Sequence, residues 1–121
     1  MSVFLQLPKD RIIFQDELFF IIRDKYPVSP GHSLIISNQL RADYFDLTND
    51  EKFHLPKVIE KCKQFIEQDF TPDGYNIGMN CGEVAGQTVM HFHCHLIPRF
   101  KGDMADPRGG VRHSVEGKGY Y

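Results

Sequence analysis

Apolar residues recur along the chain with two different periods, which predict strands in some stretches and one long helix in another. Runs rich in β-branched and aromatic residues predict strands, because such side chains suit a pleated, half-buried surface. The two residues 16–17 separate the first two runs and suit a tight hairpin. We therefore expect a mainly antiparallel, five-stranded sheet, whose strands lie within residues 11–15, 18–23, 33–37, 75–80 and 87–99.

The apolar period changes to that of an α-helix in the middle of the chain. Thr48 and Glu51 have the spacing of a capping box, which predicts the start of this helix. Pro56 removes one helical hydrogen bond and predicts a kink or a delayed start. Residues 41–47 predict a short helical turn. The apolar stripe of this helix consists of Leu55, Val58, Ile59, Cys62, Phe65 and Ile66. It should cover one face of the sheet, which predicts an α+β fold.

Length and charge indicate one domain with a distinct C-terminal segment. A chain of 121 residues fits a single domain over residues 1–121, and glycines and prolines predict an irregular tail over residues 99–121. The tail has five basic and three acidic residues, a charge of +2, against −4 for residues 1–98. This basic tail is either a solvated end or an electrostatic contact for a polyphosphate.

Composition excludes several other classes of protein. No stretch approaches the roughly 20 apolar residues of a membrane span, and the first residues lack the basic and apolar regions of a signal peptide. A net charge of −2 gives no indication of nucleic-acid binding. Three cysteines without C-x-x-C spacing argue against a disulfide framework and against a cysteine zinc site. We expect a cytoplasmic protein without nucleic-acid or membrane partners.

Three histidines alternate with apolar residues in the last predicted strand. His91, His93 and His95 should share one face of that strand, with the intervening apolar residues on the other face. Histidine titrates near neutral pH, so a row of histidines offers both a neutral nucleophile and a proton donor. A neutral imidazole attacks phosphorus when a hydrogen bond fixes its other nitrogen. His93, in the middle, is the best placed nucleophile.

The glycine-containing loop before the histidines favours phosphate over metal. Two histidines at i, i+2 can also chelate zinc or iron, so a metal site is the main alternative. The loop from Asn80 to Thr88, however, has backbone N–H groups that can surround an anion. Gly86, Gln87 and Thr88 would donate hydrogen bonds to the phosphoryl oxygens.

Residues 85–97, Ala-Gly-Gln-Thr-Val-Met-His-Phe-His-Cys-His-Leu-Ile, resemble the signature of the histidine triad (HIT) family. The signature is His-φ-His-φ-His-φ-φ, where φ is apolar, preceded by Gly-Gln-Ser/Thr. Residues 30–36 resemble an upstream strand of the same family. The resemblance implies a HIT-like fold, a homodimer whose two sheets join, and hydrolysis at the α-phosphorus of a nucleotide.

The resemblance also implies roles for individual residues. His93 attacks and forms a nucleotidyl-histidine, and His95 contacts the phosphate and assists the leaving group as an acid. His91 organises the nucleophile, and His32 orients His93 or contacts phosphate. Asp24 would bind the ribose hydroxyls. The remaining implied substrate contacts are Ile13 and Ile22 at the base and Asn80, Gly86, Gln87 and Thr88 at the phosphates.

The resemblance is compatible with more than one substrate class. Related nucleotidyltransferases have Gln at the third triad position, so His95 places the chain among hydrolases. Residues 98–99, followed by Gly102 and Asp103, favour the Fhit-like branch, which hydrolyses dinucleoside polyphosphates. The Hint branch, which acts on phosphoramidates and acyl-nucleotides, and a non-catalytic purine-nucleotide-binding protein are the alternatives. No metal or cofactor is expected beyond a divalent cation that accompanies the substrate.

Overall fold

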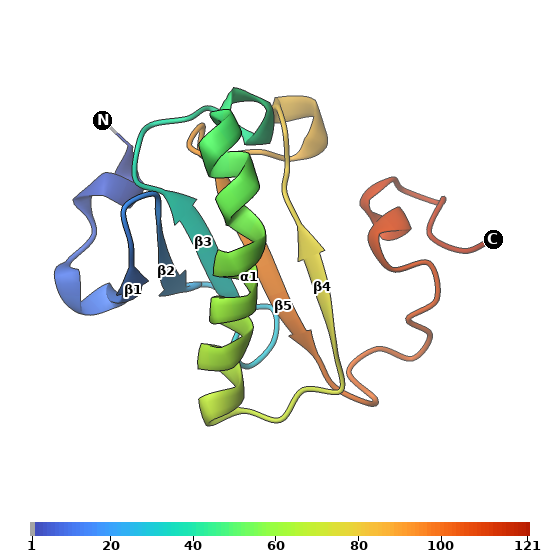
Figure 1. Ribbon diagram of the computed structural model, residues 1–121. Coiled ribbons are helices and arrows are strands. Elements are labelled where there is room, and N and C mark those ends of the chain that lie inside the picture. The colour runs from blue at the N-terminus through green and yellow to red at the C-terminus, as the bar shows by residue number, and fades with distance from the viewer. Residues whose placement is uncertain (1) are drawn as a thin grey trace.

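One antiparallel sheet with a helix on one face makes up the centre of the molecule, as expected for an α+β fold (Figure 1). The computed structural model describes residues 2–121. The spatial order of the strands is β1-β2-β3-β5-β4, and every neighbouring pair is antiparallel. The strands are β1 (Ile12–Gln15), β2 (Phe19–Arg23), β3 (Ser33–Ser37), β4 (Gly74–Gly78) and β5 (His93–Arg99).

Helix α1 (Asn49–Asp69) begins where the capping box predicts. The Thr48 side chain accepts from the Glu51 N–H, and the Glu51 side chain accepts from the Thr48 N–H. Pro56 lies inside the helix and does not delay its start. The predicted stripe faces the sheet, with Leu55, Val58, Cys62 and Ile66 buried and Ile59 and Phe65 partly buried.

The hairpin between β1 and β2 contains an irregularity that the sequence pattern does not show. The pairing register shifts between Ile12 and Phe14, which indicates a β-bulge. Ile13 and Phe14 consequently both pack in the helix-side core, whereas Ile12 packs on the opposite face of the sheet. The bulge therefore determines which isoleucine can reach a site on the face of the sheet opposite α1.

His54 of α1 contacts the β1–β2 turn, although its position off the apolar stripe predicts a surface residue. Its Nε2 lies 2.7 Å from Asp16 Oδ2, and its ring stacks on Phe19. The other oxygen of Asp16 accepts from the N–H groups of Leu18 and Phe19. His54 is thus a polar link between helix and hairpin, and only 25% of its side chain is exposed.

Short 3-10 helices occur in several of the remaining segments. The predicted turn within residues 41–47 is η3 (Tyr44–Asp46), and the N-terminal segment forms η1 (Val3–Gln6) and η2 (Lys9–Arg11). The glycine-containing loop includes η4 (Glu83–Ala85), and the tail includes η5 (Gly110–Ser114).

The tail is irregular outside η5, as expected, and lies on the β4 side of the sheet (Figure 1). Two of its five basic residues are paired inside the tail, Arg99 with Asp103 and Arg108 with Asp106. No helix within residues 2–121 is both long and apolar enough to cross a membrane.

Candidate active site

The face of the sheet away from α1 presents the functional side chains of β5. His93, His95 and Ile97 are half-buried on this face, whereas Cys94 and Leu96 are buried in the helix-side core. This alternation confirms the predicted orientation of two of the three triad histidines.

His91 is buried instead of lining a cavity with His93 and His95, although Phe4 packs against the rings of both His91 and His93. Pairing of β5 with β3 begins only at His93, opposite Ile36, so His91 lies before the strand. Its side chain is completely buried. His91 Nε2 lies 2.7 Å from the Ser37 carbonyl oxygen, and its Nδ1 lies 2.7 Å from Ser2 Oγ. Since a carbonyl only accepts, Nε2 carries the proton, and burial lowers the pKa of this ring.

The His93 ring is oriented as a nucleophile. Its Nδ1 lies 2.8 Å from the His91 carbonyl oxygen and must therefore donate to it. The Nε2 lone pair is then available to a ligand. The Phe4 ring packs edge-on against the His93 ring, with the ring centroids 5.0 Å apart, and limits the rotation of His93. The backbone contact from His91 is the one expected for a residue that organises the nucleophile.

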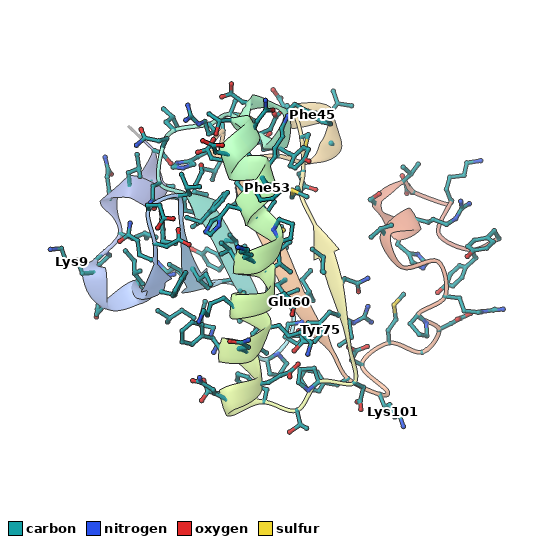
Figure 2. The ribbon with its side chains drawn as sticks, viewed as in Figure 1. Lys9, Phe45, Phe53, Glu60, Tyr75 and Lys101 are labelled. Carbon is teal, nitrogen blue, oxygen red and sulfur yellow. The ribbon has the colours of Figure 1, made fainter. Side chains whose placement is uncertain are left out.

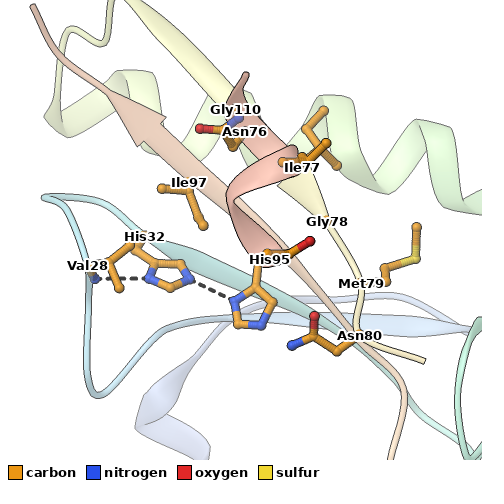
Figure 3. A pocket seen from close by; sticks show the side chains of 12 residues that line it. Val28, His32, Asn76, Ile77, Gly78, Met79, Asn80, His95, Ile97 and Gly110 are labelled. Carbon is orange, nitrogen blue, oxygen red and sulfur yellow. Dashed lines mark hydrogen bonds between the residues drawn. The ribbon is translucent and has the colours of Figure 1, made fainter. Parts of the chain in front are cut away.

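His32 and His95 form a second hydrogen-bonded pair beside His93 (Figure 3). The Val28 N–H donates to His32 Nδ1 at 3.2 Å, so the proton of neutral His32 is on Nε2. That N–H donates to His95 Nδ1 at 2.9 Å, which places the His95 proton on Nε2. The pair therefore presents an N–H group, whereas His93 presents a lone pair.

Burial keeps this pair neutral. Desolvation, followed by the nearby His93 and His32 rings, lowers the pKa of His95 to about 4. Burial also lowers the pKa of His32, against the opposing effect of the Asp24 carboxylate. His95 is therefore a neutral hydrogen-bond donor in the free protein at pH 7, rather than a protonated acid.

His32 contacts His95 and not His93, which corrects one of its two expected roles. His32 is 97% buried, and its Nε2 also lies 3.3 Å from Asp24 Oδ2. Asp24 follows β2 directly, and its N–H donates to the His32 carbonyl oxygen. The loop between β2 and β3 thus brings these two residues together at the end of the sheet.

Asp24, His32 and His95 are close enough to be considered as a metal site, because their ligand atoms all lie within 4.8 Å of one another. The protonation pattern disagrees with this interpretation. His32 Nδ1 accepts from the Val28 N–H, and its Nε2 must carry the remaining proton. A protonated nitrogen cannot ligate a metal. The cluster fits a hydrogen-bond network better than a cation.

A cavity of about 520 Å³ lies in front of these histidines. Its size suits a small organic ligand, and apolar side chains with a few polar groups line it. Ile22 lies in its wall, as expected for a base contact. Ile13 does not, because the bulge in β1 places Ile13 in the helix-side core. Asp24, Asn80, Gly86 and Thr88 also line the cavity.

The Gln87 side chain holds the loop together, contrary to its expected role as a phosphate donor. It is 97% buried. Its Oε1 accepts from the Gly82 N–H at 2.8 Å, and its Nε2 donates to the carbonyls of Ala42 and Val89. The N–H groups of Gly86 and Gln87 are likewise bonded inside the loop, to Glu83 and Gly82. Thr88 lines the cavity, and its contact with phosphate stays a prediction.

The N-terminal segment supplies cavity residues that the sequence interpretation missed. Val3, Phe4 and Leu7 line the cavity, and Phe4 also contacts the rings of His91 and His93. The signal in the sequence is a short apolar run, Val3, Phe4 and Leu5 followed by Leu7, which is too short to indicate a strand or an amphipathic helix.

Comparison with known proteins gives consistent matches at both the sequence and structure level. A family model described as the HIT domain matches residues 6–102. A bis(5'-adenosyl)-triphosphatase of Dictyostelium discoideum is 36% identical over 95 residues, 78% of this chain and 64% of that protein. An asymmetrical bis(5'-nucleosyl)-tetraphosphatase of Schizosaccharomyces pombe is 35% identical over 96 residues, 79% of this chain and 53% of that protein. The chain thus spans less than two thirds of the length of each.

A solved structure shows the same arrangement of elements. A HIT family protein from Bacillus anthracis has a TM-score of 0.71 and 39% identity, covering 76% of this chain and 65% of that one. The names of the two curated relatives support the Fhit-like branch rather than the Hint branch. The family match over residues 6–102, together with the triad on β5, shows that this chain belongs to the HIT family.

Proposed function

We propose that the protein hydrolyses dinucleoside polyphosphates at the α-phosphorus. The observation that carries this proposal is the pair of complementary rings on β5. His93 has a free Nε2 lone pair because its Nδ1 donates to the His91 carbonyl, and His95 has an Nε2–H because its Nδ1 accepts from His32. A nucleophile and a hydrogen-bond donor thus stand side by side, with ring centroids 5.3 Å apart.

The chemistry follows from these two groups. His93 Nε2 attacks the α-phosphorus, the bond to the bridging oxygen breaks, and a nucleotidyl-histidine forms. The His95 N–H stabilises the negative charge that develops on the leaving oxygen. Water then attacks the same phosphorus, the P–N bond breaks and returns its electron pair to His93, and one proton passes to solvent. The product on this side is a nucleoside monophosphate.

The cavity supports binding of the nucleoside on the attacked side. Asp24, at its rim, binds the ribose hydroxyls, and Ile22 with the N-terminal Phe4 and Leu7 forms an apolar wall for the base. The names of the Dictyostelium and Schizosaccharomyces relatives favour diadenosine polyphosphates as substrates. A divalent cation accompanies the polyphosphate as part of the substrate.

A substrate comparison tests the proposal. The purified protein is incubated with diadenosine tetraphosphate or with adenosine 5'-phosphoramidate, with and without a chelator, and products are separated by chromatography. We expect AMP release with a higher kcat/KM for the dinucleotide. A kcat/KM about a hundredfold higher for the phosphoramidate would favour a Hint-like function. Binding of AMP without turnover of either substrate would favour the non-catalytic alternative.

The protein is further proposed to act as a homodimer in the cytoplasm. β4 is an edge strand, and two aromatic side chains are exposed, Phe45 of η3 by 74% and Phe53 of α1 by 83% (Figure 2). Such features favour association of two sheets. The three unpaired cysteines fit a reducing compartment. Light scattering of the wild type and of Phe53→Glu tests the dimer, and a wild-type monomer at micromolar concentration would contradict it.

A further inference from the structure

A second cavity of about 440 Å³ lies over the same face of the sheet, beyond the triad. Its floor consists of Gly78 and Asn76 on β4 and of His95 and Ile97 on β5, where Gly78 pairs with His95 and Asn76 with Ile97. The tail closes the other side (Figure 3). We call this space the tail cavity, and its tail residues are Gly110, Val111 and Ser114.

The tail cavity meets the cavity of about 520 Å³ in front of the triad, here called the nucleoside cavity, at His95. Both cavities are lined by His95, His32, Asn80 and Val28, but His93 lines only the nucleoside cavity. The nucleophile is therefore on one side and the proton-bearing ring is at the boundary. In an in-line displacement, the leaving oxygen departs on the side of phosphorus opposite the nucleophile. A leaving group that receives the His95 hydrogen bond is thus directed to the tail cavity.

The walls of the tail cavity suit a nucleobase better than bare phosphate. Val28, Ile77, Met79, Ile97 and Val111 provide apolar surface, and Asn76, Asn80 and Ser114 provide a few donors and acceptors. The groove also continues, because a neighbouring cavity of about 370 Å³ shares Asn76, Ile97 and Gly110 with it and extends to Arg99 and His113. This length accommodates phosphates as well as a base.

Gly78 keeps the tail cavity open next to His95. A Cβ built at this position meets no heavy atom within 4 Å outside its chain neighbours, and Gly78 is not among the glycines with positive φ. Glycine is therefore not required here for backbone conformation. Its effect is the empty space beside the reacting ring.

We propose that the tail cavity is the leaving-group compartment and binds the distal nucleoside of a dinucleoside polyphosphate. The proposal rests on the proposed function, because it assigns the second half of that substrate. It gives the C-terminal tail a direct part in choosing the leaving group.

Gly78→Val tests the compartment, with Gly74→Val as the matched control. Both glycines lie on the same face of β4, and a Cβ at either meets no heavy atom within 4 Å, but only Gly78 lines the tail cavity. The two substrates are diadenosine tetraphosphate and adenosine 5'-phosphoramidate, which share the attacked nucleotide and differ in the leaving group. We expect Gly78→Val to lower kcat/KM for the dinucleotide by about tenfold or more and that for the phosphoramidate by less than about twofold, whereas Gly74→Val changes neither.

If Gly78→Val lowers kcat/KM equally for both substrates, or for neither, the proposal that the tail cavity binds the leaving group is overturned. If the wild type hydrolyses neither substrate, the proposed function fails. A binding measurement then tests separately whether the tail cavity holds the distal nucleoside. In a His93→Ala background, calorimetry should then show tighter binding of diadenosine tetraphosphate than of AMP, and Gly78→Val should remove that difference. Equal affinities for the two nucleotides before the substitution would overturn the compartment as well.

Discussion

At the residue scale, groups that only donate or only accept determine the protonation of the site histidines. The carbonyls of Ser37 and His91 and the N–H of Val28 fix one nitrogen each, and the His32–His95 bond fixes the last. The sequence predicts His93 as the nucleophile, since His93 lies in the middle of the row. It could not predict which nitrogen is free, because the residue pattern shows neither the direction of the His91 carbonyl nor the contact between His32 and His95.

The lowered pKa values of His32, His91 and His95 predict lower stability in acid. Their common cause is burial, which disfavours the charged ring. In the unfolded chain these histidines have their ordinary pKa of 6.5, so below that pH they bind more protons in the unfolded chain than in the folded one. The free energy of unfolding should therefore fall as pH decreases from about 6.5, and the contribution of His95 should be fully lost below about 4.

Chemical denaturation at about pH 7.5 and about pH 5 checks this dependence. The wild type should lose stability between the two pH values. His95→Gln, which removes one titrating ring, should lose less over the same interval. An equal loss in both proteins would show that His95 does not contribute to the pH dependence.

Gln87 provides a second test at the residue scale. Gln87→Glu replaces the amide that donates to the Ala42 and Val89 carbonyls with a carboxyl oxygen. Loss of two buried hydrogen bonds should lower the free energy of unfolding by about 2–4 kcal/mol, measured by denaturation. If the side chain instead served mainly to bind phosphate, stability would be unchanged and only KM would rise.

At the scale of elements, local signals predicted the helix well and the boundaries of the site strand poorly. The capping box and the apolar stripe of α1 are contained in consecutive residues, so the sequence shows them directly. The start of β5 depends instead on where β3 can pair, since Ile36 is the last partner. The alternating pattern continues through His91, but the ladder does not. The bulge in β1 is likewise a property of the pairing with β2.

Pro56 makes a prediction for α1. Proline removes the hydrogen bond to the carbonyl four residues earlier, and position 56 is exposed inside the helix. Pro56→Ala should therefore raise the free energy of unfolding by about 1–3 kcal/mol without changing kcat. Lys57→Ala, at the next exposed position, is the control and should change stability by less than about 0.5 kcal/mol. A lower stability for Pro56→Ala would show that the ring has a favourable packing role.

At the scale of the whole molecule, both ends of the chain complete the site that β5 begins. The N-terminal segment adds Phe4 beside the nucleophile, and the tail adds a wall beside His95. The periodicity and the triad together predicted the sheet, the helix on one face and the orientation of His93 and His95. They did not predict the contributions of the two ends, because these contacts join residues far apart in sequence and leave no local pattern.

The most direct test of the account is to locate the covalent intermediate. The wild type and His93→Ala are mixed briefly with diadenosine tetraphosphate at neutral pH, digested and analysed by mass spectrometry. The account predicts one nucleotidyl group on the peptide that contains His93 in the wild type, and neither adduct nor AMP release in His93→Ala. An adduct on another residue, or hydrolysis by His93→Ala at the wild-type rate, would contradict it.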